Sequence, residues 1–130
     1  MSIASAYAQA NGLNSIVTGV QAQDEYSYWD TTPAFIGAMN GVLAQNRMHD
    51  IQIFAPWQGV NKTTEIQILQ ALDGNASLLD TTITCYNPAG NVSCGTCPSC
   101  AERIQNFARA GLKDNIPYAI DIQWDKLIQG

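Results

Sequence analysis

The sequence predicts a small α/β domain with a mostly parallel sheet. Helical and strand-like segments alternate along the 130 residues, a length that allows one hydrophobic core. Short β-branched runs predict strands at residues 15–20 (SIVTGV) and 51–56 (IQIFAP). Because two strands alone do not form an independently stable parallel sheet, the pattern also indicates that part of the sheet is supplied from outside this sequence.

Two helices are predicted in the first half of the sequence. The alanine-rich stretch 2–12 has apolar residues at helical spacing and ends at Gly12. A second helix is expected over about 33–46, because Pro33 suits a first helical turn and an apolar stripe follows it. Asp30 or Thr32 would be its N-cap.

Two more helices are predicted in the second half. Thr64 and Gln67 have the spacing of a capping box and would open a helix that ends at Gly74. Ser99 and Glu102 have the same S-x-x-E spacing, which predicts a last helix that stops near residue 111. The segment 77–84 between these helices has no clear pattern.

The composition excludes some classes of partner. Only 13% of the residues are charged while 46% are hydrophobic, which indicates a surface that is buried against a partner, so we expect a homo- or hetero-oligomer. A net charge of -5 with six Lys and Arg residues argues against binding of bulk nucleic acid. No run of about 18 apolar residues and no basic leader occurs, so we expect a cytoplasmic protein without a membrane span.

The cysteines are the densest chemical signal. Cys85, Cys94, Cys97 and Cys100 follow the pattern C-x8-C-x2-C-x2-C, and they are the only cysteines in the sequence. Four thiolates at such intervals can close around one tetrahedral ion, with tight turns at Gly95 and Pro98. We therefore expect a zinc site, and one with no open coordination position, whose role is structural.

Three other interpretations of the cysteines remain open at this stage. A disulfide framework requires an oxidising compartment, which nothing in the sequence indicates. An iron–sulfur cluster also takes four cysteines, and C-x2-C-x2-C occurs in ferredoxins, but their clustered fourth cysteine followed by proline is missing here. A redox-active thiol is the third alternative.

The cysteine segment and its surroundings resemble a known family. TCYNPAGNVSCGTCPSCAERIQNFARAGLKDNIPY is similar to the zinc-binding segment of the 7-cyano-7-deazaguanine synthases, the QueC family, where T-x-S/T-C-Y-N precedes C-G-x-C-x-x-C-x-x-R. The four cysteines and Arg103 stand at the matching positions. Upstream, Pro56, Lys62 and Glu65 resemble the family pattern P-L-x-x-x-x-K-x-E-I, with one extra residue between the lysine and the glutamate.

The resemblance also covers a loop at residues 21–32. Asp24, Tyr28 and Asp30 match the family pattern D-x-S-G-Y-P-D-C-R, which follows a strand and precedes a helix. The remaining positions depart from it: Tyr26 and Ser27 replace Ser-Gly, Trp29 replaces Pro, and Thr31 and Thr32 replace Cys-Arg.

The resemblance implies a fold, a domain organisation and a reaction. The fold would be the C-terminal portion of an adenine-nucleotide-alpha-hydrolase-like (PP-loop ATP pyrophosphatase) fold, in one domain of residues 1–130. Residues 1–80 would be its α/β portion with the substrate loop 21–32, and residues 81–118 its zinc-binding segment and last helix. The family converts 7-carboxy-7-deazaguanine, ammonia and ATP to the nitrile, as a carbon–nitrogen ligase in queuosine biosynthesis.

The resemblance also implies partners and ligand-binding residues. The family's S-G-G-x-D-S loop, which binds ATP phosphates, does not occur in this sequence, so ATP would be bound by a partner polypeptide, and no activity is expected of the chain alone. Within the pocket that the resemblance implies, the residue types of the loop suggest that Asp24 and Asp30 accept hydrogen bonds from the deazapurine, that Tyr28 and Trp29 stack on it, and that Lys62 faces its carboxylate or a phosphate. The alternative is that Asp24 and Asp30 are only turn residues before the helix at Pro33. Catalytic residues are not assigned. The alternative function is a non-catalytic, zinc-stabilised binding module or a truncated relative.

Overall fold

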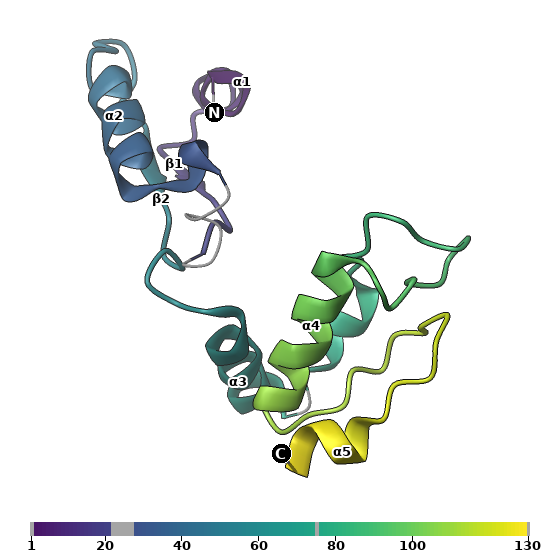
Figure 1. The fold of residues 1–130 in the computed structure, drawn as a ribbon. Helices are drawn as coiled ribbons and strands as arrows, with labels where there is room; N and C mark the ends of the chain where they lie inside the picture. The colour runs from purple at the N-terminus through teal and green to yellow at the C-terminus, as the bar shows by residue number, and fades with distance from the viewer. Residues whose placement is uncertain (1, 22–27, 75, 130) are drawn as a thin grey trace. The chain divides into compact units, whose positions relative to one another are not determined.

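A computed structural model describes residues 2–21, 28–74 and 76–129. The chain divides into two compact units, residues 1–61 and 62–130, and each is described separately below. Its elements are shown in Figure 1, and the mixture of helices with a parallel β pair confirms the predicted α/β class. The proposed single domain with a division at residue 80 stays a prediction.

The first unit contains a two-stranded parallel sheet with a helix packed against each strand. α1 (Ser2–Ala10) packs against β1 (Ser15–Val17), and α2 (Pro33–Leu43) packs against β2 (Gln52–Phe54). Ile16 pairs with Ile53 at the centre of the parallel register. Both predicted strands are therefore present, although each is shorter than the β-branched run that predicted it.

The start of α2 shows why that helix begins at Pro33. The side chain of Thr32 accepts a hydrogen bond from the backbone N–H of Phe35 at 3.2 Å, so Thr32 is the N-cap. Of the two predicted caps, Thr32 is confirmed and Asp30 is not, because Asp30 lies inside the short 3-10 helix η2 (Trp29–Thr31).

The second unit is a helical cluster. α3 (Lys62–Asp73) packs on α4 (Pro98–Arg109), and α4 packs on α5 (Trp124–Gln129); a 3-10 helix, η3 (Ser77–Thr81), follows α3. The hydrophobic core joins all three α-helices, through Ile66, Ile104, Phe107 and Trp124. None of the helices within the described ranges is long and apolar enough to span a membrane.

Two predicted helix starts are wrong, by three positions for α3 and by two for α4. α3 begins at Lys62, so Thr64 already lies inside the first turn and is not the cap. α4 begins at Pro98 with Cys97 as its N-cap, because the Cys97 sulfur accepts a hydrogen bond from the N–H of Cys100. The sulfur of a cysteine thus occupies the place that the S-x-x-E pattern assigned to the hydroxyl of Ser99.

Candidate metal centre and ligand loop

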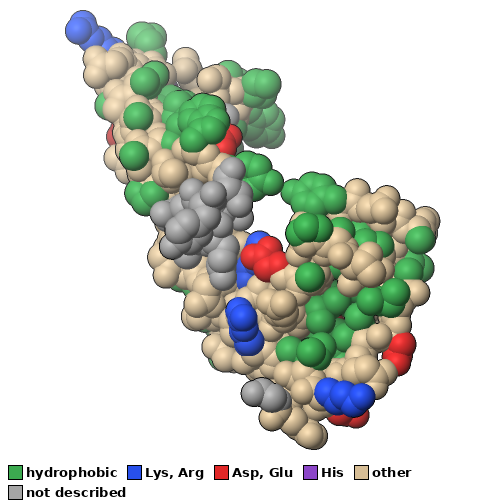
Figure 2. Space-filling model, in the orientation of Figure 1, with side chains coloured by type: hydrophobic (Ala, Val, Ile, Leu, Met, Phe, Trp, Pro, Cys, Tyr) green, Lys and Arg blue, Asp and Glu red, His purple; other side chains and the backbone are tan. Residues whose placement is uncertain are grey.

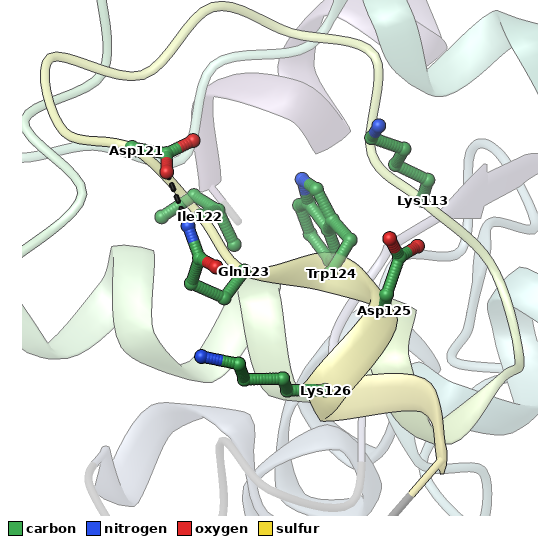
Figure 3. A pocket seen from close by; sticks show the side chains of 7 residues that line it. All are labelled: Lys113, Asp121, Ile122, Gln123, Trp124, Asp125 and Lys126. Atoms are coloured by element: carbon green, nitrogen blue, oxygen red, sulfur yellow. Dashed lines mark hydrogen bonds between the residues drawn. The ribbon is translucent and has the colours of Figure 1, made fainter.

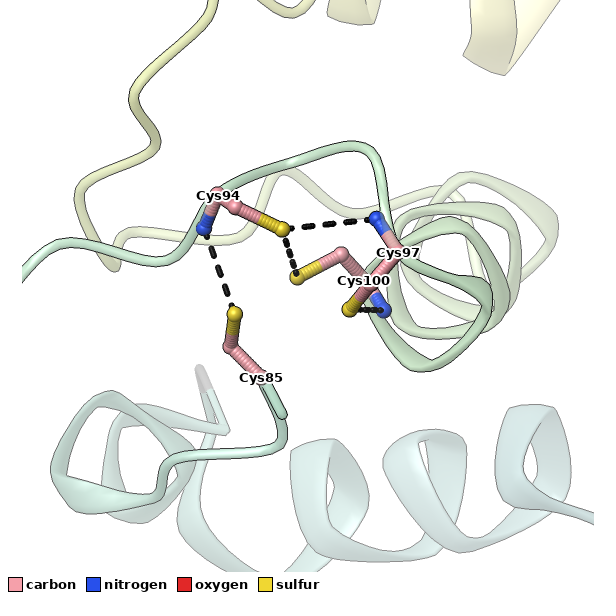
Figure 4. A group of neighbouring side chains, drawn as sticks. All are labelled: Cys85, Cys94, Cys97 and Cys100. Atoms are coloured by element: carbon pink, nitrogen blue, oxygen red, sulfur yellow. Dashed lines mark hydrogen bonds between the residues drawn. The ribbon is translucent and has the colours of Figure 1, made fainter. Parts of the chain in front are cut away.

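The structure brings the four cysteines together from three segments of the second unit. Cys85 follows η3, Cys94 lies in the loop before α4, and Cys97 and Cys100 belong to the start of α4 (Figure 4). All four Sγ atoms lie within 4.8 Å of one another, and none forms a disulfide. Sulfurs around a tetrahedral zinc with bonds of about 2.3 Å are separated by about 3.8 Å, so this group is close to a metal-binding arrangement.

Backbone N–H groups point at the sulfurs and hold them in place. The N–H of Cys94 donates to the Sγ of Cys85 at 3.3 Å, and the N–H of Cys97 donates to the Sγ of Cys94 at 3.3 Å. The N–H of Cys100 completes the series with a bond of 3.4 Å to the Sγ of Cys97. Such donors stabilise thiolates and orient them, as the outer shell of a metal site does.

The thiols differ in how readily they lose their protons. Hydrogen bonds from the backbone of Thr96, and next from that of Cys97, lower the pKa of Cys94 to about 6. The pKa of Cys97 is also lowered, chiefly by the backbone N–H of Cys100. Burial raises the pKa of Cys100 to about 12, so a metal ion must displace the proton of this thiol at neutral pH.

A close backbone approach fixes the turn between Cys94 and Cys97. Gly95 has a φ of +77°, and a Cβ atom at this position would lie 2.5 Å from Cγ1 of Ile120. On the other side of Cys94, Ser93 donates its N–H to the carbonyl of Pro117 at 3.1 Å. Segment 117–120 therefore packs directly against the cysteine loop, and only glycine fits at residue 95 without displacing Ile120.

Arg103 connects α4 to the segment that carries Cys85. Its guanidinium forms a two-point ion pair with Asp114, at 2.6 and 3.2 Å, and both side chains are buried, with 7% and 0% of their area exposed. The same group donates to the hydroxyls of Thr82, at 2.8 Å, and Thr84, at 3.1 Å. Arg103, which the resemblance placed beside the zinc ligands, thus positions the chain that enters Cys85.

The partners of Arg103 are not evident from the sequence. Burial opposes the charge of Arg103, but the hydrogen bond and charge of Asp114 more than compensate, so the arginine pKa is raised. The hydroxyl of Tyr118 donates to Asp114 at 2.7 Å, and burial together with this carboxylate raises the tyrosine pKa. The spacing in the sequence does indicate that Arg103 is buried, because it lies one helical turn after Cys100 and therefore on the same face of α4. A buried arginine requires a carboxylate partner, so an ion pair could have been expected.

The predicted ligand loop is described only in part. Asp24 lies outside the described residues. Tyr28 and Trp29 are exposed over 53% and 77% of their surface, and Asp30 is exposed beside them. The ring of Trp29 meets that of Phe35 edge-on, with 5.3 Å between centroids, which leaves much of the indole surface open to a stacking ligand.

The two threonines that depart from the family pattern have local structural roles. The Thr31 hydroxyl donates to the carbonyl of Tyr28 at 2.7 Å, and the Thr32 hydroxyl donates to the carbonyl of Trp29 at 3.0 Å. Thr32 also caps α2, as described above. These bonds fix the backbone that presents Tyr28, Trp29 and Asp30.

Lys62 belongs to the second unit, at the first position of α3. Its ammonium forms an ion pair with Glu102 of α4 at 2.9 Å, and both side chains are partly exposed. A carboxylate of the chain itself is therefore among the partners of Lys62. Its predicted contact with a ligand stays a prediction.

A separate pocket lies at the start of α5. It has a volume of about 300 Å³ (Figure 3), and it is lined by Lys113, Asp121, Ile122, Gln123, Trp124, Asp125 and Lys126. The Gln123 amide donates a hydrogen bond to Asp121 within it. No residue predicted to bind substrate or metal lines this pocket, so it does not extend the candidate site.

Comparison with known proteins gives one consistent result. The family model described as queuosine biosynthesis protein QueC matches residues 1–111. A 7-cyano-7-deazaguanine synthase of Psychromonas ingrahamii is 38% identical over 120 residues, which are 91% of this chain and 52% of the relative. The enzymes of that name from Methanospirillum hungatei and Trichormus variabilis are 36% and 39% identical, again over 91% of this chain. The chain spans about half the length of these curated relatives.

Proposed function

Because the chain belongs to the QueC family, we propose that it is the substrate- and zinc-binding half of a 7-cyano-7-deazaguanine synthase, and that it works with a second, ATP-binding half. The observation that carries the proposal is the family match over residues 1–111, together with four cysteine sulfurs within 4.8 Å of one another. In the fold implied by the family, the parallel β1–β2 pair is part of an adenine-nucleotide-alpha-hydrolase-like sheet.

The proposed reaction joins ammonia to 7-carboxy-7-deazaguanine at the expense of ATP, first to the amide and then to the nitrile. A carboxylate is a poor electrophile. Transfer of AMP from ATP, with release of pyrophosphate, converts it to an acyl adenylate, from which ammonia displaces AMP to form the amide; a second such activation of the amide oxygen allows its loss as AMP to leave the nitrile. The ATP-binding half supplies that activation. The residues of this chain bind and orient the deazapurine.

The exposed side chains beside η2 are suited to a planar ligand. Trp29 offers a ring face for stacking, and the carboxylate of Asp30 can accept hydrogen bonds from the guanine-like N–H edge. Tyr28 adds a second aromatic surface, and Asp24 is proposed as a further acceptor on the family match alone. Lys62 must release Glu102 before it can face a carboxylate or phosphate.

The four cysteines are proposed to hold zinc in a structural role. An all-thiolate set leaves no open coordination position, so the ion would join the Cys85 segment to the start of α4 and take no part in the chemistry. Elemental analysis of the purified chain should find one zinc per chain. Iron with acid-labile sulfide would instead favour the iron–sulfur alternative.

The function is tested by reconstitution. The chain is combined with a polypeptide carrying the S-G-G-x-D-S loop, ATP, ammonium and 7-carboxy-7-deazaguanine, and the nitrile is followed by mass spectrometry. We expect product only when both polypeptides are present. Absence of both nitrile and association between the polypeptides would overturn the proposal, and binding of the deazapurine without turnover would support a binding module.

A matched pair of variants tests the ligand loop. Asp30→Asn should raise the KM for the deazapurine by about tenfold or more, since a charged hydrogen bond is worth about 1.5–3 kcal/mol. Asp50→Asn removes an exposed carboxylate from the same unit and changes the net charge equally, so it should leave KM unchanged. Equal effects of the two variants would remove Asp30 from the site.

A further inference from the structure

Asp114 is a buried carboxylate to which the proposed function gives no role. Charged groups normally lie at the surface, and Figure 2 shows those on one face of the molecule. The side chain of Asp114, in contrast, is 0% exposed. Four donors surround its two oxygens: two N–H groups of Arg103, the backbone N–H of Ile116 and the hydroxyl of Tyr118. These donors offset the cost of removing the carboxylate from water, and they tie it to several parts of the second unit.

The first connection runs from Asp114 to the segment that enters Cys85. The guanidinium of Arg103 binds Asp114 through Nε, at 2.6 Å, and through Nη2, at 3.2 Å. Held in this orientation, its Nη1 donates to the hydroxyls of Thr82 and Thr84, at 2.8 and 3.1 Å. Thr84 directly precedes Cys85 in the chain. Asp114 therefore fixes, through Arg103, the direction from which this cysteine enters the cluster.

The second connection runs from Asp114 to Cys94. The hydroxyl of Tyr118 donates to Oδ2 of Asp114 at 2.7 Å. Tyr118 in turn lies opposite Ser93 in a parallel β-bridge, in which backbone hydrogen bonds of 3.1 and 2.8 Å join Ser93 to the residues on either side of Tyr118. Because Ser93 directly precedes Cys94, one carboxylate holds both cysteines that lie outside α4.

The other two cysteines, Cys97 and Cys100, are placed by α4 itself, the helix that also carries Arg103. Ligands from separate segments lose chain entropy when an ion collects them, so contacts that already hold them in place raise the affinity. We propose that Asp114 is a positioning residue for the metal site, which holds Cys85 through Arg103 and Cys94 through Tyr118 beside the two cysteines of α4. This inference rests on the zinc site proposed above.

The affinity for zinc tests the role of the carboxylate. Asp114→Asn keeps the shape of the side chain but removes its charge and one of its acceptor oxygens. We expect the dissociation constant for zinc, measured by competition with a chromophoric chelator, to rise by about 10–100-fold, the usual effect of losing an outer partner of metal ligands. Asp125→Asn removes an exposed carboxylate from the same unit and changes the net charge equally, so it should leave the affinity unchanged.

Two milder variants separate the two connections. Arg103→Lys keeps a positive charge for Asp114 but lacks the fork that reaches both threonines, and Tyr118→Phe removes only the hydroxyl. Each zinc-loaded variant is treated with iodoacetamide, and the alkylation rate of every cysteine is followed by mass spectrometry relative to the unchanged chain. Arg103→Lys should raise the rate at Cys85 by about tenfold more than at the other cysteines, and Tyr118→Phe should do the same at Cys94. A role in stability alone would raise all four rates together.

The outcomes that overturn the positioning role differ from those that overturn the function. An unchanged zinc affinity in Asp114→Asn overturns the positioning role, even where the reconstituted synthase makes the nitrile. Equal rises at all four cysteines in both milder variants also overturn it, and these variants decide the matter if Asp114→Asn does not fold. A chain that takes up no zinc contradicts the zinc site and this inference with it. The expected alkylation pattern in a chain that never makes the nitrile contradicts the synthase function only.

Discussion

The two units differ in how far each satisfies its own polar groups and covers its own apolar side chains. In residues 62–130 the buried guanidinium of Arg103 has six hydrogen-bond acceptor atoms within the unit, and one core connects α3, α4 and α5. In residues 1–61 the side chain of Asn40 bonds to both backbone groups of Ile53 and so covers the outer edge of β2, while the outer edge of β1 and the groove between α1 and β1 are exposed. The second unit therefore pairs its buried charge from within, whereas the first leaves one sheet edge and the groove beside it exposed.

This difference fits the positions of the cysteine cluster and of the exposed groove between α1 and β1, which lie in different units. A closed four-cysteine site supplies folding free energy to the segment that contains it, which suits the part of the chain with long loops between short helices. A parallel sheet gains its stability from further strands, which suits association.

Metal removal should have the largest effect, and it should be confined to the second unit. Structural zinc in small domains contributes about 10–16 kcal/mol, so chelation should abolish amide protection in the cysteine loop and at the start of α4. The Cys100→Ser variant should lose the metal in the same way. Protection at β1 and β2 should persist, and a loss of protection spread evenly over both units would contradict the comparison.

The affinity for zinc should rise with pH because the metal replaces protons on the thiols. Burial raises the pKa of Cys100 to about 12, so this thiol carries a proton throughout the accessible pH range. Zinc must displace that proton at every pH, so Cys100 contributes the same slope to log affinity at all pH values. Cys94, with a pKa of about 6, becomes protonated only as the pH falls through that value. A plot of log affinity against pH should therefore become steeper below about pH 6, and a straight line would contradict the assignment.

The next largest effect is expected from Arg103→Ala. It leaves the fully buried carboxylate of Asp114 without its charge partner, which costs about 3–5 kcal/mol in the free energy of unfolding. Urea denaturation measures this loss. Arg109→Ala, at an exposed site on the same helix, should change stability by less than about 0.5 kcal/mol. The double variant Arg103→Ala, Asp114→Asn should recover part of the loss, because the unpaired charge is gone.

The sequence predicted the elements whose signals are local. The two β-branched runs predicted the strands, the apolar stripe after Pro33 predicted α2, and the cysteine spacing predicted the cluster of four sulfurs; the structure confirms all three. The sulfur cap on α4 was missed because Cys97 is read as a metal ligand first, although its sulfur also accepts an N–H at the helix start.

What the sequence did not reveal depends on contacts between residues distant along the chain. In the sequence, nothing distinguishes Asp114 and Tyr118 from other loop residues. Their contact network with Arg103 forms only because the fold places them beside α4. Asn40 lies on a helix whose period predicts its burial, but its bidentate bond to Ile53 requires the position of β2. Asp24 lies outside the described residues, so its role stays a prediction.

Gly95→Ala should destabilise the second unit by about 2–3 kcal/mol, as measured by chemical denaturation. The substitution strains a backbone with positive φ and also places a methyl group against Ile120. Gly90→Ala is the matched control, because residue 90 also has positive φ but its Cβ would meet nothing within 4 Å. It should cost only about 1 kcal/mol. Equal losses would show that the contact with Ile120 is not restrictive.

Asn40→Ala should destabilise the first unit by about 1–2 kcal/mol, since it removes two hydrogen bonds that cover the edge of β2. It should also speed amide exchange at Ile53 and leave the core of α4 unaffected. Asn11→Ala, which removes an exposed side-chain bond to the carbonyl of Tyr7, should cost less than about 0.5 kcal/mol. A change in exchange at α4 would mean that the units are not independent in stability.

The smallest effect on stability is expected from Lys62, and this is what makes it informative about function. The ion pair with Glu102 is partly exposed, so Lys62→Ala and Glu102→Ala should each change the free energy of unfolding by at most about 1 kcal/mol. If the ammonium only supports α3 on α4, both variants should behave alike in the reconstituted enzyme. If it leaves Glu102 to bind a carboxylate or phosphate, Lys62→Ala should lower kcat/KM by about tenfold or more while Glu102→Ala leaves it unchanged or raises it, because the competing carboxylate is removed.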